Sequence, residues 1–71
     1  MHYLRHIEVT SYVDGTIVLS TGHQLRVVDG ESGPELNDCD WSALVTDPNV
    51  SLSRDEQDTL YLYLTSPEVV Q

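Results

Sequence analysis

Lysine and phenylalanine are both absent from this chain of 71 residues, and three arginines stand against twelve aspartates and glutamates. The formal net charge is −9. Three cationic side chains cannot neutralise enough phosphates to hold a nucleic acid. A surface this acidic is also repelled by anionic membranes and is steered toward basic partners. The composition therefore argues against direct binding to nucleic acid or membrane.

Cysteine is nearly absent too, since Cys39 stands alone and no disulfide can form within the chain. A lone cysteine is typical of a reducing compartment. The N-terminal "MHYLRHIEV" lacks the apolar segment of a signal peptide, and no apolar run approaches the ~20 residues of a membrane span. We expect a soluble, cytoplasmic protein.

The short length predicts one small acidic domain over residues 1–71, which buries only about 60% of the surface of its unfolded chain. Valine, leucine, isoleucine and tyrosine suffice for a thin core. These residues recur in periodic runs, which favours a folded domain over a disordered tail.

Residues 3–28 predict a three-stranded antiparallel meander. "YLRHIEVTSYV" at 3–13 is rich in β-branched and aromatic residues, with Ile7, Val9 and Tyr3 on one face. "DG" at 14–15 is a hairpin signal because Gly15 tolerates positive φ. The chain continues with "TIVLS", the turn "TGH" at 21–23 and "QLRVV", with inward residues Ile17, Leu19, Leu25 and Val27.

The next stretch, "DGESGPELNDCD" at 29–40, holds five carboxylates with no basic residue among them: Asp29, Glu31, Glu35, Asp38 and Asp40. Gly30, Gly33 and Pro34 predict a loop without regular structure. Asn37 or Asp38 then caps a short helix. Its residues Trp41, Leu44 and Val45 face the sheet at i, i+3, i+4 spacing, and "DPN" at 47–49 ends it.

Two structures fit the last segment. "SRDE" at 53–56 forms a capping box, with Ser53 as N-cap and Glu56 at N3, for a helix that Pro67 would end. "VSLS" at 50–53 and "LYLYL" at 60–64 also alternate, as in a hairpin with Val50, Leu52, Leu60, Leu62 and Leu64 inside. The helix is favoured because "RDEQDT" is long for a turn. The fold class is thus α+β, a small antiparallel β-meander of three or more strands with one or two short helices.

Metal and catalytic sites find little support in the pattern. An EF-hand loop starting at Asp29 would need an oxygen ligand where Gly33 stands and glycine where Pro34 stands. His2 and His6 would lie about 13 Å apart on a strand, too far for one zinc ion, and His23 and Cys39 lack a metal-binding motif. No nucleophile elbow or phosphate-binding glycine loop is present. We expect no enzymatic activity, no cofactor and no metal site, with a cation-binding module as a remaining alternative.

The carboxylates instead suggest a recognition surface. Asp55, Glu56 and Asp58 form a second cluster, "RDEQD". Outward carboxylates on a rigid scaffold can imitate the spacing of phosphates and enter a groove lined by arginine and lysine. Tyr61, Tyr63 or Trp41 would supply the apolar anchor. The simpler interpretation is a solvated acidic face that maintains solubility, in a proteome that avoids lysine.

In these features the chain resembles the small acidic inhibitors of phages and mobile elements, namely anti-CRISPR proteins and DNA mimics. The similar features are the length, the missing lysine, and the "DGESGPELNDCD" and "RDEQD" clusters. The resemblance implies an inhibitory or regulatory protein that binds a basic, nucleic-acid-gripping surface such as a CRISPR effector complex. These families share no motif, so no residue role carries over. The alternative is a structural accessory subunit, a homodimer or larger homo-oligomer formed through an exposed β-edge or the "LYLYL" face.

Overall fold

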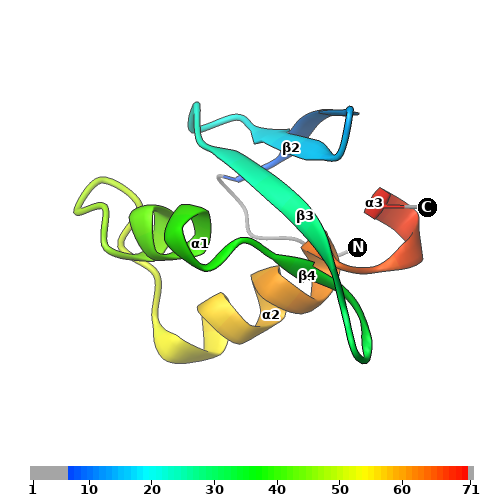
Figure 1. Cartoon of the computed structure of the whole chain (residues 1–71). Coiled ribbons are helices and arrows are strands. Elements are labelled where there is room, and N and C mark those ends of the chain that lie inside the picture. The colour runs from blue at the N-terminus through cyan, green and yellow to red at the C-terminus, as the bar shows by residue number, and fades with distance from the viewer. Residues whose placement is uncertain (1–6, 71) are drawn as a thin grey trace.

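The computed structural model describes residues 7–70 and places four antiparallel strands before three short helices (Figure 1). The sheet has the order β1-β2-β3-β4, so each strand pairs with the next along the chain. The elements are β1 Val9–Val13, β2 Thr16–Leu19, β3 Gln24–Gly30, β4 Gly33–Leu36, α1 Asp38–Val45, α2 Arg54–Leu64 and α3 Pro67–Val70. The α+β class expected from the sequence is confirmed.

Residues with positive φ make the first two turns. Asp14 (φ 55°) and Gly15 (φ 75°) lie between the paired residues Val13 and Thr16. Two successive positive φ values define the type I′ hairpin, whose twist matches that of the strands it joins. In the second turn Gly22 has φ 96°, and the Leu19 amide donates to the His23 carbonyl at 3.0 Å.

A β-bulge interrupts the alternation expected along the first strand. Val9 pairs with Leu19 and Ser11 pairs with Val18, so Thr10 is the extra residue. After the bulge, the alternation of side chains between the two faces of the sheet is reversed. Tyr12 rather than Ser11 therefore packs against the core. Ile7 is buried as the parity predicts, whereas Tyr3 lies outside the described residues.

The stretch 29–40 is not the irregular loop that its glycines and proline predict. Gly30 ends β3, Gly33 begins β4, and the pair Gly30–Gly33 closes a hairpin. The Asn37 amide donates to the Arg26 carbonyl at 2.8 Å. Because hydrogen-bonded pairs alternate in an antiparallel ladder, Pro34 falls where an N–H would point away from β3. An edge strand tolerates proline at such a position.

The core lies between the inner face of the sheet and the helices. Its buried side chains are Ile7, Ile17, Leu19, Leu25, Leu36, Leu44, Val50, Leu60 and Leu64. Strands β2 to β4 contribute Ile17, Leu19, Leu25 and Leu36 to it, and α2 contributes Leu60 and Leu64. Within residues 7–70 no polar or charged residue is buried, so this thin core depends on apolar packing alone.

The segment after residue 52 is helical, and the alternative hairpin is wrong. Both capping-box bonds form: the Glu56 amide donates to Ser53 Oγ at 3.2 Å, and the Ser53 amide donates to Glu56 Oε1 at 2.9 Å. Helical geometry separates residues two apart onto different faces. Leu60 and Leu64 are therefore buried, while Leu62 is 71% exposed.

Candidate protein-binding surface

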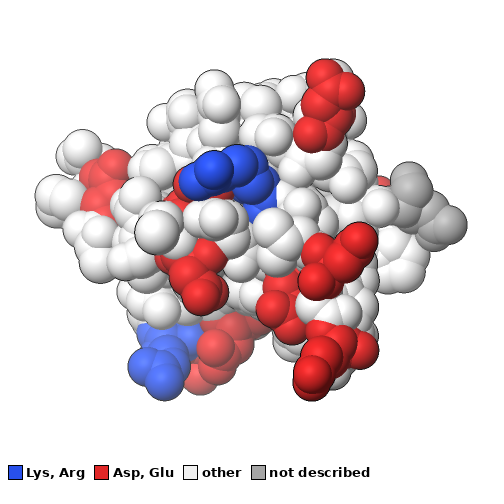
Figure 2. All heavy atoms as spheres, in the orientation of Figure 1, with Lys and Arg blue, Asp and Glu red and all other residues white. Residues whose placement is uncertain are grey.

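Three carboxylates gather at the tip of the β3–β4 hairpin. Asp29 is the next-to-last residue of β3, Glu31 lies in the two-residue loop, and Glu35 lies on β4. All three are exposed. Figure 2 shows acidic side chains over this hairpin, which lies at the lower right in Figure 1. Within residues 7–70 none of the three forms an ion pair. We call Asp29, Glu31 and Glu35 the hairpin cluster.

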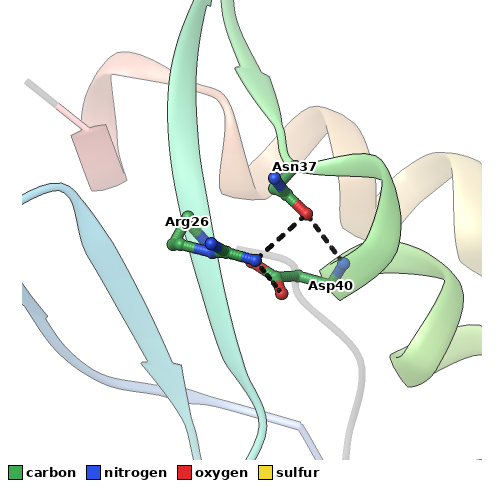
Figure 3. Close-up of polar contacts among 3 residues, drawn as sticks. All are labelled: Arg26, Asn37 and Asp40. Atoms are coloured by element: carbon green, nitrogen blue, oxygen red, sulfur yellow. Dashed lines mark hydrogen bonds and ion pairs between the residues drawn. The ribbon is translucent and has the colours of Figure 1, made fainter.

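Asp40 was predicted as part of the same surface, but it is engaged within the fold (Figure 3). Its Oδ2 accepts from Arg26 Nε at 2.8 Å and from the Arg26 backbone amide at 3.0 Å, and Oδ1 accepts from Arg26 Nη2 at 3.1 Å. Arg26 Nη2 also reaches Asn37 Oδ1 at 3.5 Å. These bonds join β3 to α1, so Asp40 contributes little net charge to the surface.

The same pairing shifts both ionisation equilibria. The hydrogen bond from the Arg26 side chain, followed by that from its backbone amide, lowers the pKa of Asp40 below 3.8. The hydrogen bond to Asp40, together with its charge, raises the pKa of Arg26. Each partner favours the charged form of the other, as expected for a charge-assisted pair.

The first turn of α1 presents Asp38 and Cys39 to solvent. Asn37 caps this helix, and its Oδ1 accepts from the Asp40 amide at 3.1 Å. Asp38 and Asp40 both lie in the first turn, where the helix dipole favours negative charge. Helix formation thus places the exposed Asp38 close to the engaged Asp40.

The second predicted acidic cluster divides between surface and fold. Asp55 and Asp58 are exposed. Glu56 is half-buried, because its carboxylate caps the Ser53 amide. Spacings of three and four residues place Asp55, Asp58 and Leu62 along one side of α2. We call Asp55, Asp58 and Leu62 the helix cluster.

The predicted aromatic anchors are used in packing. Tyr61 Oη accepts a hydrogen bond from the Leu36 amide at 3.1 Å, which ties α2 to the edge strand β4. The Trp41 and Tyr61 rings meet edge to face, with their centroids 5.1 Å apart and an interplanar angle of 89°. Tyr63 is half-buried and packs against the core. These aromatics join elements of the fold rather than project from it.

Sequence reasoning missed the apolar residues that the surface does expose. They are Leu62 at 71%, Val13 at 62% and Val28 at 44% exposed. Val13 and Val28 occupy outward positions on their strands, opposite Thr16 and Glu35. Alternation in "QLRVV" indicates an outward position for Val28, whereas the bulge at Thr10 reverses the parity that the sequence predicts for Val13.

A series of polar contacts among Thr21, His23 and Asp47 lies away from these clusters. His23 Nε2 is 3.1 Å from Asp47 Oδ2, and its Nδ1 is 2.7 Å from Thr21 Oγ1. These contacts tie the β2–β3 turn to the end of α1. No pocket was found beside them, and residues 7–70 contain no group of three His, Cys, Asp or Glu side chains placed to hold a metal ion. His2 and His6, considered above as zinc ligands, lie outside the described residues.

In the described part of the chain, no helix has the length and apolar character needed to cross a membrane. No protein-family model matches the chain, and neither a curated protein nor a solved structure does.

Proposed function

We propose that this chain is a non-catalytic inhibitory or regulatory protein of the cytoplasm. Its acidic surface binds a basic protein surface that otherwise grips nucleic acid. The resemblance to anti-CRISPR proteins and DNA mimics suggests a CRISPR effector complex as one such partner. The observation that supports this most directly is the hairpin cluster, three exposed carboxylates with no ion pair within residues 7–70.

The physical basis is electrostatic complementarity. Complementary charge raises the association rate and suppresses wrong partners, and with a net charge of −9 the field extends beyond single contacts. Asp29 and Glu35 lie on paired strands and Glu31 in the two-residue loop between them, so little conformational entropy is lost when a partner binds. Asp38, Asp55 and Asp58 extend the exposed negative surface, whereas Asp40 and Glu56 support the fold beneath it.

The test is an affinity capture from cells of the source organism at about 50 mM and about 300 mM salt, conditions that change the screening length about 2.5-fold. We expect a basic nucleic-acid-binding protein that elutes at the higher salt and is displaced by DNA or RNA. The Asp29→Asn/Glu31→Gln/Glu35→Gln variant should lose it. The charge-conserving control Asp29→Glu/Glu31→Asp/Glu35→Asp should retain most binding. Capture unaffected by both salt and the neutral variant would refute the proposal.

A second candidate is a homo-oligomeric accessory subunit whose acidity reflects only its proteome. The 71% exposure of Leu62 favours it, because a large apolar side chain open to solvent can pack against a second copy of the chain. Light scattering after size exclusion separates the two functions. A dimer that persists at high salt and dissociates in Leu62→Gln supports the accessory subunit.

A further inference from the structure

We infer that the outer face of the sheet, around Val13 and Val28, is the centre of the contact and that it receives a cationic, amphipathic segment of a partner protein. This inference rests on the proposed function and specifies where and what the acidic surface binds.

The strand register defines this face. Ile17 pairs with Leu25, and Val27 pairs with Leu36, with three of these four buried and Val27 packed against the core. Because side chains alternate across a strand, the pairs Val13–Thr16, Thr16–Arg26 and Val28–Glu35 point to the other side. Val13 and Val28 are 62% and 44% exposed there. Two β-branched residues thus remain open to solvent on the outer face of the sheet.

The β4 edge of the sheet is not open to strand addition by a partner. In the ladder of β3 and β4, the alternation of hydrogen bonds turns residues 34 and 36 outward. Pro34 has no N–H, and the Leu36 amide already donates to Tyr61 Oη at 3.1 Å. Strand addition needs free outward donors. A partner at this side of the molecule therefore lies over the face instead of extending β4.

Carboxylates flank the two valines. Asp14 follows Val13 in the turn, and Glu35 is paired with Val28 across the strands, whereas Asp29 alternates with Val28 and has the parity of the inner face. The Glu35 carboxyl group lies over Gly30, since a Cβ added at Gly30 would overlap it. The Glu35 side chain thus extends over Gly30 rather than over its strand partner Val28, which stays exposed beside it.

Among residues 7–70, the cation on this face is Arg26, and its charge is paired within the fold. Arg26 extends toward α1, where its guanidinium binds Asp40 (Figure 3). A ligand that matches the face therefore combines apolar side chains for Val13 and Val28 with arginine or lysine for the surrounding acids. A second copy of the chain would bring like charges together, which is unfavourable at a desolvated contact.

The helix cluster provides a matched control. Leu60 and Leu64 turn toward the core, so Leu62 faces away from the sheet, with Asp55 and Asp58 on the same side of α2. It offers one exposed apolar residue with two carboxylates. The outer sheet face offers two such residues, with Asp14 and Glu35 beside them.

The experiment uses two fluorescein-labelled helical peptides of equal charge. The first combines arginine and alanine with leucine at i, i+3 and i+4 spacing, and the second replaces each leucine by serine. Fluorescence anisotropy measures their affinity for the whole protein. We expect the leucine peptide to bind more tightly, and Val13→Thr/Val28→Thr to weaken it about tenfold, the effect of burying part of two valine side chains. Leu62→Gln should change affinity less than about twofold, the range of surface substitutions.

The charge comparison removes two negative charges in each of two places. Asp14→Asn/Glu35→Gln should weaken the leucine peptide several-fold more than Asp55→Asn/Asp58→Asn, although both variants have the same net charge. Amide chemical shifts of the unmodified protein locate the contact independently of any variant. Shifts should concentrate in 13–16 and 26–35 rather than in 54–64.

The possible failures are distinguishable. If the helix-cluster variants lose binding and the shifts map to 54–64, the sheet face is overturned while the proposed function stands. Equal affinity for the two peptides also overturns it, because the valines then contribute nothing. If neither peptide binds and no basic protein is captured in the salt-dependent assay above, both proposals fail.

Discussion

Residues of the same type have opposite roles within a few positions of this chain. The Asp40 carboxylate accepts hydrogen bonds from both the side chain and the backbone amide of Arg26. Its side chain is only 17% exposed. Asp38, two positions earlier, is exposed on the first turn of the same helix. A charge-reversal experiment that includes Asp40 would therefore disturb the fold together with the surface.

The Arg26–Asp40 pair should make stability depend on pH in a defined direction. Because the pKa of Asp40 is lowered below 3.8 in the folded protein, the pair contributes stability above that value and loses it as pH falls through the folded pKa. In urea unfolding, the wild type should exceed Asp40→Asn in free energy of unfolding by a constant amount above about pH 5. The difference should shrink toward acid. A difference independent of pH would contradict this role of the pair.

At the scale of elements, α2 shows how helical periodicity divides an alternating sequence. "LYLYL" at 60–64 satisfies a strand pattern, yet the capping box at Ser53 and Glu56 begins a helix that continues through it. The helix buries Leu60 and Leu64, exposes Leu62, and directs the Tyr61 hydroxyl to the backbone of β4. One helix thus completes the core and satisfies the edge of the sheet.

Two leucines of α2 should differ sharply in their effect on stability. Leu60→Ala should lower the free energy of unfolding by about 2–5 kcal/mol, since it removes a side chain that is 1% exposed. Leu62→Ala removes the same atoms from a 71% exposed position and should cost less than about 0.5 kcal/mol. Chemical denaturation followed by circular dichroism measures both. Similar losses in the two variants would be inconsistent with the helix.

At the scale of the whole molecule, a thin core holds together a strongly charged surface. A net charge of −9 on 71 residues opposes compaction through self-repulsion. Among the described residues only two ion pairs are found, Arg26 with Asp40 and His23 with Asp47. The negative charge of most carboxylates is therefore not neutralised by a neighbouring cation. The surface that would attract a basic partner therefore also destabilises the free protein.

Salt should accordingly stabilise this protein. Between about 20 mM and about 500 mM sodium chloride, screening weakens the repulsion among exposed carboxylates, and calorimetry should show a rising Tm. The Asp29→Asn/Glu31→Gln/Glu35→Gln variant, which has three fewer negative charges, should start from a higher Tm and rise less. A Tm that falls with salt in the wild type would show that attraction, not repulsion, dominates the surface.

The β3–β4 hairpin shows where sequence reasoning reached its limit. Gly30, Gly33 and Pro34 are typical of a loop, and each has a local reason to interrupt a strand. Pairing with β3 overrides that tendency, because Gly33 takes φ 125° at the hairpin and Pro34 falls at an outward position of the edge strand. Such a position can be recognised only when the partner strand and its register are known.

The sequence by itself determined the features that depend on neighbouring residues: the positive-φ turn at Asp14 and Gly15, the capping box at Ser53 and Glu56, and the excess of negative charge. Only the tertiary structure decided which acids are neutralised and which apolar residues remain exposed. Arg26 and Asp40 are 14 residues apart, and Val13 and Val28 are exposed because the helices cover the other face of the sheet. Contacts between distant segments follow from how the elements pack, which no local pattern contains.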